Sequence, residues 1–380
     1  MTRRRLAVVH WFPIEYYPPV TNTLNCFAKN QDLQIVCFTS HNAKNREPFA
    51  NAGCRIHRYK FPQRGQHLLV RLYCYIFFPL IVFLRLLWLR PHSILYMEPQ
   101  SAMPVFLYTL LARRCRIFIH NHEYHDQHQF LRPGMRLVRI YHWLEKKFIF
   151  QRAEWISQTN TDRIQFFQRD FPDIDSTRLH ELPNLPPQLW METPNRAWKT
   201  QDGKLRLVYV GSLSCEDTFI RELVEWMDSD SAANCELDVY SYNHTSEVKQ
   251  LFEANTNSRI SFHEDGVAYE QLPEVLSEYH VGLILYRATT TNYMFNASNK
   301  LFEYLALGLD VWYPSQMLGV KPYARCDRAP RVVEVEFEQL ASMTMPSMLE
   351  RNRLPLCPST DSCESALIPL QSTLLGTPPE

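Results

Sequence analysis

Glycine is scarce in this chain, since only 10 of the 380 residues are glycine, against a usual share of about 7%. A phosphate loop of the type G-x-G-x-x-G needs three closely spaced glycines, and no segment contains them. The sequence therefore excludes this fingerprint, and any phosphate site must use other donors.

Cys-x-x-Cys pairs and a recognisable signal-peptide pattern are also lacking. The 10 cysteines form no Cys-x-x-Cys pair and have no regular spacing. The first residues, MTRRRLAVVHWFP, contain an apolar run of only about five residues, too short for a signal peptide. We therefore expect reduced thiols and a cytoplasmic protein.

Only one segment has a long apolar run. Residues 72–84 are uncharged, but Arg71 and Arg85 bound the run and Pro79 interrupts it. The run is thus shorter than the roughly 18–20 residues that span a bilayer. We expect a helix over 68–89 that is apolar nearly all round and buried in the core. The alternative is a helix that touches an anionic membrane at its inner face.

The chain has no net charge, but its two halves differ. Residues 1–184 contain 25 Lys and Arg against 13 Asp and Glu, which leaves 15 against 27 of the 40 and 40 in the whole chain. The basic first half, including Arg3, Arg4 and Arg5, suits an anionic lipid surface. Zero net charge and the lack of a recognised binding motif argue against a nucleic-acid partner.

Short β-branched or apolar runs alternate with longer segments of helical period, as is typical of βαβ units around a parallel sheet. The strands that this pattern predicts are 6–10, 33–38, 54–59, 93–97, 115–120, 155–158, 205–210, 236–241, 259–262, 281–286 and 310–313. The predicted helices are 20–30, 68–89, 101–113, 134–152, 160–169, 217–228, 245–254, 269–278 and one from Ser298.

The alternation stops once, in the proline-bearing residues 185–204, which predict a linker. We therefore expect an α/β protein with two Rossmann-like domains, over 1–184 and 205–350, that face each other across a cleft. Ligands of such sheets bind at the carboxyl ends of the strands. The Pro- and Ser-rich residues 351–380 predict a loose tail.

The segment SNKLFEYLALG, residues 298–308, predicts a short helix with a polar face. Its amino end, with Ser298, Asn299 and Lys300, combines a cation with free N–H groups and suits a diphosphate. Glu303 lies one turn further and can accept hydrogen bonds from two vicinal hydroxyls, such as those of a ribose. Gly308 suits the end of the helix. A capped surface helix with an ordinary ion pair remains an alternative.

Six segments resemble, in this order and spacing, the family 4 type of GT-B glycosyltransferases in its bacterial polysaccharide branch. They are IHNHEYHD (119–126), EWISQTNTDRIQFF (154–167), LPNLPPQLW (182–190), LVYVGSLS (207–214), YEQLPEVLSEYHVGLILY (269–286) and NASNKLFEYLALGLDVW (296–312). The resemblance covers roughly residues 5–345. It implies the GT-B fold, an acceptor-side first domain and a nucleotide-sugar second domain.

The resemblance also implies roles for single residues of the second domain. Glu303 would hold the ribose of the donor, and Lys300 would lie beside its diphosphate. Gly211, with Ser212 and Leu213, would let the backbone approach the phosphates closely.

Two positions depart from the family pattern. Phe295 stands where a second glutamate usually contacts the sugar of the donor. Glu216 and Asp217 stand where the family has an arginine and a lysine that neutralise the leaving diphosphate. Lys300 and Arg287 remain the candidates for that charge stabilisation.

Four histidines lie within HNHEYHDQH, residues 120–128. His120, His122 and His125 have a spacing that occurs in metal sites, but no other ligand cluster completes one. The resemblance implies chemistry without a metal, so we expect neither a metal nor a cofactor. We favour an interpretation in which His120 and His122 approach the acceptor or the donor sugar and Glu123 binds a substrate hydroxyl. A purely structural loop remains open.

Aromatic residues follow the first predicted strand. Tyr17, with Tyr16 and Trp11, could stack on a sugar ring, while packing of a rigid loop is the alternative.

The resemblance thus implies a glycosyltransferase that moves a sugar from a nucleotide sugar to a glycan or lipid-linked acceptor with retention. Its catalytic residues would be His122, Lys300 and Glu303. One alternative is a non-catalytic nucleotide-sugar-binding or scaffold subunit of a polysaccharide-assembly system. Another is a GT-B epimerase, which alters the donor without any acceptor.

Overall fold

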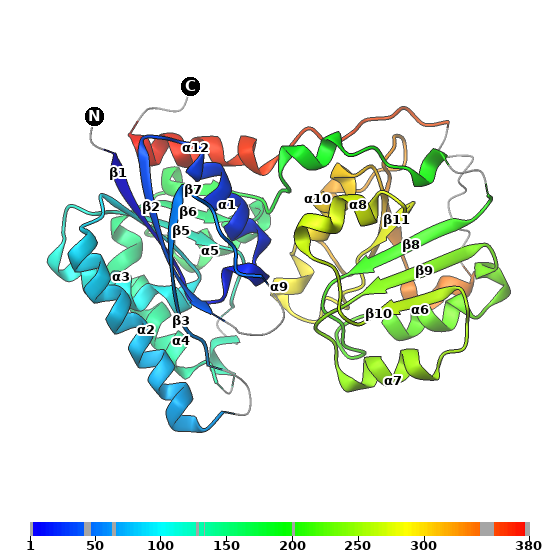
Figure 1. Ribbon diagram of the computed structural model, residues 1–380, viewed down its shortest axis with the longest axis horizontal. Coiled ribbons are helices and arrows are strands. Elements are labelled where there is room, and N and C mark those ends of the chain that lie inside the picture. Colours follow the sequence, from blue (N-terminus) through cyan, green and yellow to red (C-terminus); the bar gives the residue numbers. More distant parts are fainter. Residues whose placement is uncertain are drawn as a thin grey trace. The chain divides into compact units, whose positions relative to one another are not determined.

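The structure, a computed structural model, describes residues 3–41, 47–62, 66–126, 129–132, 134–199, 202–342 and 353–376. His128, residues 343–350 of the predicted second domain, and both ends of the predicted tail lie outside the described residues. The chain divides into two compact units, Met1–Asn184 with Cys363–Glu380, and Leu185–Ser362. Figure 1 shows a parallel sheet with helices on its faces in each unit.

The first unit contains a parallel sheet of seven strands in the order β3-β2-β1-β4-β5-β6-β7. The strands are β1 (Arg4–His10), β2 (Leu33–His41), β3 (Cys54–Lys60), β4 (Ser93–Met97), β5 (Arg116–Asn121), β6 (Ala153–Gln158) and β7 (Leu179–Glu181). The helices are α1 (Pro18–Ala28), α2 (Leu68–Leu89), α3 (Ala102–Leu111), α4 (Arg136–Leu144), a π-helical turn (Glu145–Ile149) and α5 (Thr161–Asp170). Central strands such as β4 are buried along their whole length, as expected of a parallel sheet that is covered on both faces.

The second unit contains a parallel sheet of six strands in the order β10-β9-β8-β11-β12-β13. The strands are β8 (Leu205–Val210), β9 (Cys235–Tyr240), β10 (Ile260–His263), β11 (Val281–Leu283), β12 (Asp310–Pro314) and β13 (Val332–Val335). The helices are α6 (Ile220–Met227), α7 (Ser246–Ala254), α8 (Leu272–Leu276), α9 (Thr291–Met294) and α10 (Asn299–Ala306). In both sheets the strand order reverses beside the first strand of the unit, which is the usual place for a ligand in an open α/β sheet.

The predicted α/β class and the predicted strands are confirmed, with β7 and β13 added by the structure. Local chemistry explains several boundaries. Pro18 opens α1, where a missing N–H costs nothing, and the Asn160 side chain accepts from the Arg163 N–H at the start of α5. Gly308 ends α10 with φ of 76°, a left-handed conformation that glycine adopts without strain.

The predicted linker belongs to the second unit. The backbone N–H groups of Arg196 and Ala197 both donate to the Ser277 carbonyl, at 2.7 and 3.1 Å. The Trp198 indole N–H donates to the Gly308 carbonyl at 3.1 Å. These bonds attach residues 195–198 to α8 and to the end of α10, although the segment has no helical or strand period of its own.

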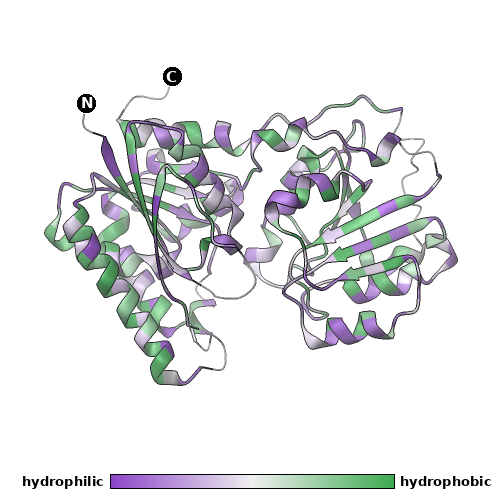
Figure 2. Cartoon of the chain, in the orientation of Figure 1, coloured by the Kyte–Doolittle hydropathy of each residue, from purple (hydrophilic) through white to green (hydrophobic). Residues whose placement is uncertain are grey.

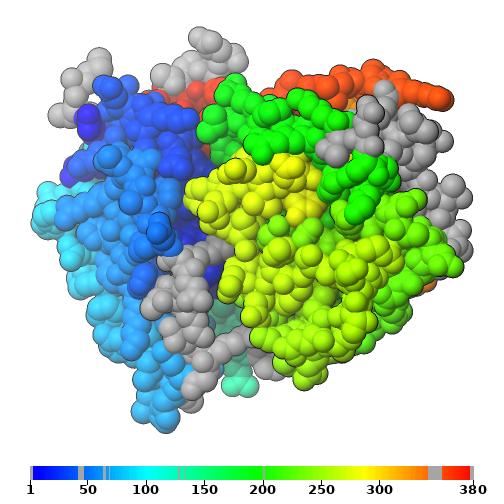
Figure 3. Space-filling model, turned by 45° about the vertical axis from the view of Figure 1, so that its right-hand side comes forward, coloured from blue at the N-terminus to red at the C-terminus, as the bar shows by residue number. Residues whose placement is uncertain are grey.

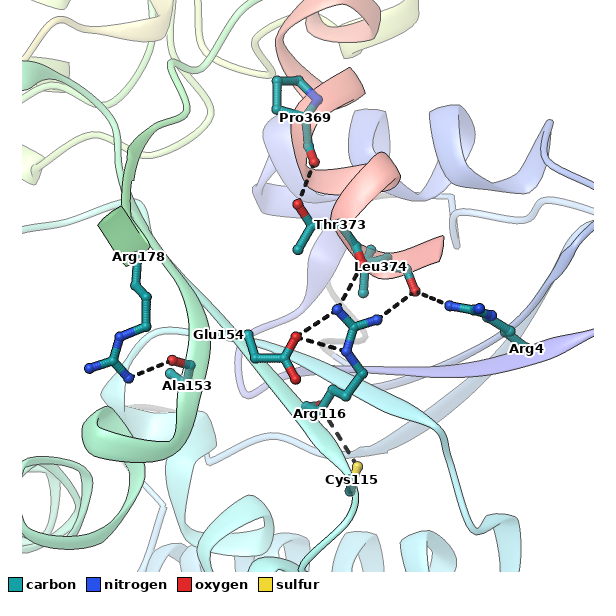
Figure 4. A network of polar contacts seen from close by, with 9 residues as sticks. All are labelled: Arg4, Cys115, Arg116, Ala153, Glu154, Arg178, Pro369, Thr373 and Leu374. Carbon is teal, nitrogen blue, oxygen red and sulfur yellow. Dashed lines mark hydrogen bonds and ion pairs between the residues drawn. The ribbon is translucent and has the colours of Figure 1, made fainter. Parts of the chain in front are cut away.

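The prediction of a loose tail is wrong for residues 363–375, which form α12 (Cys363–Leu375). Leu367, Leu370 and Leu374 of this helix are buried, and α12 packs against α1 of the first unit. Figure 4 shows how its carboxyl end is held: Arg116 of β5 donates to the Thr373 and Leu374 carbonyls at 2.8 and 3.1 Å, and Arg4 of β1 donates to the Leu374 carbonyl at 3.2 Å. These cations satisfy carbonyls that a helix leaves unpaired and complement its dipole. Both partners are far away in sequence, so the local pattern did not reveal the helix.

The prediction that helix 68–89 is buried all round is also wrong. One side of α2, including Phe78, Val82 and Leu86, is buried in the core of the first unit. The opposite side exposes large apolar side chains such as Leu80, Leu84 and Trp88. By length and composition, residues 69–89 could cross a membrane, and 28% of the most apolar stretch is buried within the structure. Figure 2 shows α2 as a largely hydrophobic helix.

Candidate functional site

In the second unit, the predicted residues meet where β8 ends and α10 begins. Gly211 follows β8 with φ of 145°. A Cβ atom at this position would lie 2.6 Å from the Lys300 Cε and 2.8 Å from its Nζ. The missing side chain of Gly211 therefore leaves the space that the end of Lys300 occupies, a reason for glycine that the sequence did not reveal.

Tyrosines hold the Lys300 ammonium. It donates to the Tyr286 hydroxyl at 2.8 Å and lies 5.1 and 5.8 Å from the ring centres of Tyr286 and Tyr209, within reach of cation–π attraction. Burial lowers the pKa of Lys300, but Tyr286 and Glu303 raise it, and the net shift is upward. The lysine is therefore a cation at neutral pH, placed in the first turn of α10, where backbone N–H groups add positive potential.

Glu303 lies three residues after Lys300 and is only 8% exposed. Burial raises its pKa to about 7, although the charge of Lys300 lowers it. This carboxyl therefore changes its charge near neutral pH. Its environment favours a partner that donates hydrogen bonds to the carboxylate.

The other residues predicted to bind the nucleotide sugar differ in how exposed their side chains are. Leu213 is buried in the hydrophobic core of the unit, and its backbone N–H donates to the Asn243 carbonyl at 3.0 Å, so neither its side chain nor its N–H is directed at a ligand. Ser212 is exposed, while Ser298 and Asn299 form the start of α10. Phe295 ends α9.

Arg287 and Asp217 each have a side-chain partner of their own within the unit. Arg287 forms an ion pair with Glu222 of α6, and its guanidinium lies 4.4 Å from the Phe219 ring centre. The Asp217 carboxylate accepts from the Ser214 hydroxyl at 2.8 Å. Because Arg287 is neutralised by Glu222, Lys300 is the better placed of the two cations to meet an anion.

In the first unit, three histidines gather at the carboxyl ends of β1 and β5, which lie on either side of β4 in the sheet. His10 ends β1, and His120 and His122 come from the end of β5; all three are buried. The His122 ring centre lies 4.4 Å from that of His120 and 6.4 Å from those of His10 and Tyr17. The structure thus brings together the predicted His120, His122 and Tyr17.

Hydrogen bonds determine which nitrogens of these rings carry protons. The Ser157 hydroxyl donates to the Ile119 carbonyl at 3.2 Å, so its oxygen accepts from the His120 Nδ1–H at 2.9 Å. His120 Nε2 then has a lone pair and accepts from the His122 Nδ1–H at 3.2 Å. The Asn184 oxygen, also 3.2 Å from His122 Nδ1, agrees with this direction.

The chain of bonds leaves His122 Nε2 without a proton. This buried atom has no hydrogen-bond partner among the residues that the structure describes. Burial lowers the pKa of His122 to about 4, so the ring is neutral at pH 7. His122 is therefore suited to accept a hydrogen bond from a ligand hydroxyl rather than to carry charge.

Acidic and basic groups surround the histidines. Glu98, which follows β4 with φ of 67°, accepts from the backbone N–H groups of His122 and Glu123 at 2.7 and 3.3 Å. Burial and the neighbouring Glu123 raise the pKa of Glu98 to about 8. The side chain of Glu123 is exposed and lies 3.9 Å from His125. Arg163 of α5 donates to the His122 carbonyl at 2.7 Å.

Five further members of this cluster were not predicted from the sequence: His10, Glu98, Ser157, Arg163 and Asn184. His10, Glu98 and Ser157 lie at or next to strand ends, so the rule that ligands gather there could have identified them. In the described part of the chain, no group of three or more His, Cys, Asp or Glu side chains is arranged to hold a metal ion.

Acid should destabilise the histidine cluster. Burial lowers the pKa of His10 to about 3 and that of His122 to about 4, and it lowers that of His120 as well. Below about pH 6.5 the unfolded chain therefore binds more protons at these sites, and the free energy of unfolding decreases as the pH falls toward 4. The raised pKa of Glu98 acts in the opposite direction between pH 8 and 4.5, so it offsets one of the three histidines there.

Comparing variants separates these contributions. His122→Asn should reduce the slope of unfolding free energy against pH by up to about 1.4 kcal/mol per pH unit, as measured by urea unfolding between pH 4.5 and 7. His41→Asn, at an exposed position, is the matched control. Equal slopes in wild type and His122→Asn would contradict the neutral state assigned to His122.

Comparison with known proteins identifies the fold. No protein-family model and no curated protein sequence matches this chain. Among solved structures, it is similar to sucrose-phosphate synthase from Thermosynechococcus elongatus, with a TM-score of 0.64, 12% identity, and coverage of 98% of this chain and 91% of that one.

Two further solved structures are also similar to this chain. Anabaena HepE, solved in complex with UDP and glucose, is similar with a TM-score of 0.56, 10% identity, and coverage of 89% and 88% of the two chains. UDP-GlcNAc 2-epimerase from Methanocaldococcus jannaschii has a TM-score of 0.56, 10% identity, and coverage of 97% and 99%. With its two parallel Rossmann-like sheets, this chain has the GT-B fold that glycosyltransferases and UDP-GlcNAc epimerases share.

Proposed function

We propose that this protein is a retaining glycosyltransferase that moves a sugar from a nucleotide sugar to a glycan or lipid-linked acceptor. The observation that supports it best is the arrangement at the start of α10, where the Lys300 ammonium occupies the space beside Gly211 and Glu303 follows one turn later. A cation at a helix amino end suits a diphosphate, and a buried carboxylate suits the hydroxyls of a ribose.

In this proposal Lys300 stabilises the negative charge that develops on the departing nucleoside diphosphate. Glu303 positions the nucleotide through its ribose. His122 accepts a hydrogen bond from a sugar hydroxyl at Nε2, and Tyr17 offers a ring face beside it. Since the pKa of His122 is about 4, its role is to orient a hydroxyl rather than to remove a proton at neutral pH.

We also propose a cytoplasmic location. All ten cysteines are unpaired in the structure, which agrees with a reducing compartment.

A panel of nucleotide sugars tests the transferase proposal. Purified protein should release a nucleoside diphosphate from at least one donor, faster when a lipid-linked or oligosaccharide acceptor is added, and the product should keep the anomeric configuration of the donor. Lys300→Ala serves as the negative control.

Two other outcomes would identify the alternatives. A donor that changes its sugar configuration without any acceptor would indicate an epimerase. Nucleotide binding without turnover of any donor, with or without acceptors, would favour the scaffold subunit, for which the departures at Phe295, Glu216 and Asp217 are the arguments.

A further inference from the structure

The exposed side of α2 is a continuous apolar stripe. Its large side chains are between 36% and 74% exposed, and they recur at intervals of mainly three and four residues, so they share one face of the helix. These residues are Leu69, Leu72, Tyr73, Ile76, Phe77, Leu80, Leu84 and Trp88. In Figure 3 the helix lies at the surface, in light blue at the lower left.

Neighbouring helices extend this apolar surface. α2 packs against α3, and α3 packs against α4 and the π-helical turn that follows it. The end of α3 exposes Leu110 and Leu111, and α4 with the turn exposes Ile140, Trp143 and Phe148. Soluble monomers rarely expose large contiguous apolar patches, so large exposed apolar side chains on three helices that pack side by side indicate an interaction site.

The exposed charges on these elements and their ends have one sign. They are Arg71, Arg85, Arg90, Arg113, Arg114, Arg136, Arg139, Lys146 and Lys147. Residues 66–97 and 99–122 contain no Asp or Glu. The acidic residue within 129–148, Glu145, is 1% exposed and accepts from the Tyr96 hydroxyl at 2.8 Å. The surface therefore combines large apolar side chains with charged side chains that are all basic.

We propose that the exposed faces of α2, α3 and α4 form a docking surface for an anionic lipid bilayer. Leucine, isoleucine and phenylalanine side chains would enter the boundary between headgroups and acyl chains, while the arginines and lysines meet the lipid phosphates. Trp88, Trp143 and Tyr73 are the side chains that prefer this boundary. Lys147 lies 5.1 Å from the Trp143 ring centre and 5.4 Å from that of Phe148, so cation and aromatic groups reach the same depth.

The packing of α2 argues for docking rather than spanning. Cys74, Phe78, Val82 and Leu86 on its inner face are at most 1% exposed and belong to the core of the unit. A spanning helix would have to withdraw these side chains from the sheet. A second copy of the chain is also a poor occupant, because two basic surfaces facing each other repel.

The experiment is flotation of the full-length protein with vesicles. Wild type should float with vesicles that contain phosphatidylglycerol and phosphatidylcholine, and remain at the bottom with pure phosphatidylcholine. Because each basic residue near an anionic surface contributes about fivefold in affinity, Arg139→Gln/Lys146→Gln/Lys147→Gln should weaken binding about 100-fold. Raised salt should weaken wild type in the same direction.

The apolar part is tested with Leu80→Gln/Leu84→Gln/Trp88→Gln, which should abolish flotation without loss of folding, because all three positions are exposed. The matched control is Leu189→Gln, at a 70% exposed leucine of the second unit, which should float as wild type does. Wild type that stays at the bottom with phosphatidylglycerol vesicles at low salt overturns the proposal. A second result would also overturn it: in sedimentation, wild type is a dimer and the Leu80/Leu84/Trp88 variant is a monomer, while lipid binding is the same for both.

This proposal does not depend on the transferase activity. A protein that floats but turns over no donor would support the docking surface and contradict the proposed function.

Discussion

Lys300→Ala should lower turnover of the donor by about 10²–10³-fold, the usual effect of removing one group that stabilises developing negative charge. The expectation rests on position and charge together. The Lys300 ammonium lies in the first turn of α10, is held by the Tyr286 hydroxyl at 2.8 Å, and has a raised pKa. Arg287 does not replace it, because Glu222 pairs with that arginine.

Three variants make the Lys300 result interpretable. Lys321→Ala changes another lysine of the same unit, one that lies 3.6 Å from Glu334, and should leave turnover unchanged. Tyr286→Phe removes the hydroxyl that holds the ammonium and should have an intermediate effect. Gly211→Ala should also reduce turnover, since its Cβ would displace the end of Lys300. A folded Lys300→Ala protein with wild-type turnover would refute the role of the lysine.

Glu303→Gln should weaken binding of the nucleoside diphosphate by about 1.5–3 kcal/mol, because hydrogen bonds to a charged acceptor are stronger than those to an amide. This corresponds to a loss of about 10- to 150-fold at pH 8. Calorimetric titration with a series of nucleoside diphosphates measures it. Glu274→Gln, at an exposed position on α8, is the matched control.

The pH dependence sharpens the Glu303 experiment. Burial raises the pKa of this carboxyl to about 7, so it is mostly protonated at pH 6 and mostly charged at pH 8. If the ribose binds the carboxylate, affinity should fall up to about tenfold per pH unit below pH 7. The nucleotide phosphate itself titrates near pH 6, and for this reason the slope of wild type is compared with that of Glu303→Gln. Parallel slopes would contradict binding to the carboxylate.

Most of the fold could be predicted because most strands and helices correspond to short apolar runs or to segments of helical period in the sequence. The buried strands β4 and β8 are short apolar runs between polar segments, and the structure places both at the predicted positions. β13 and α12 were not predicted, since β13 is a four-residue strand at the edge of its sheet and α12 depends on Arg4 and Arg116, partners distant in sequence. Pro369 inside α12 also obscured its period.

The burial of α2 could not be predicted from composition. Its residues are apolar on both sides, so periodicity gives no sign of which side meets the sheet. Only packing distinguishes Phe78 and Val82, which are buried, from Leu80 and Leu84, which are exposed.

The site was predictable in part. Lys300 and Glu303 were predicted from their spacing on one face of a helix. His120 and His122 were predicted from their position at the end of a strand. The hydrogen bonds from Ser157 through His120 to His122 join residues of two strands that are separated by more than thirty positions. The pairing of Arg287 with Glu222 likewise joins residues 65 positions apart. Such partners are set by strand order, which a single sequence does not specify.

The return of α12 to the first unit changes the order in which the ribosome can complete the two units. All of residues 185–362 are synthesised before α12, so the second unit is complete first even though it comes later in the chain. At a synthesis rate of about 5–20 residues per second, roughly 10–40 seconds pass between the synthesis of residue 184 and that of α12. During this time the surface of α1 that α12 later covers is exposed to solvent, so we expect the nascent chain to bind chaperones that recognise exposed apolar segments.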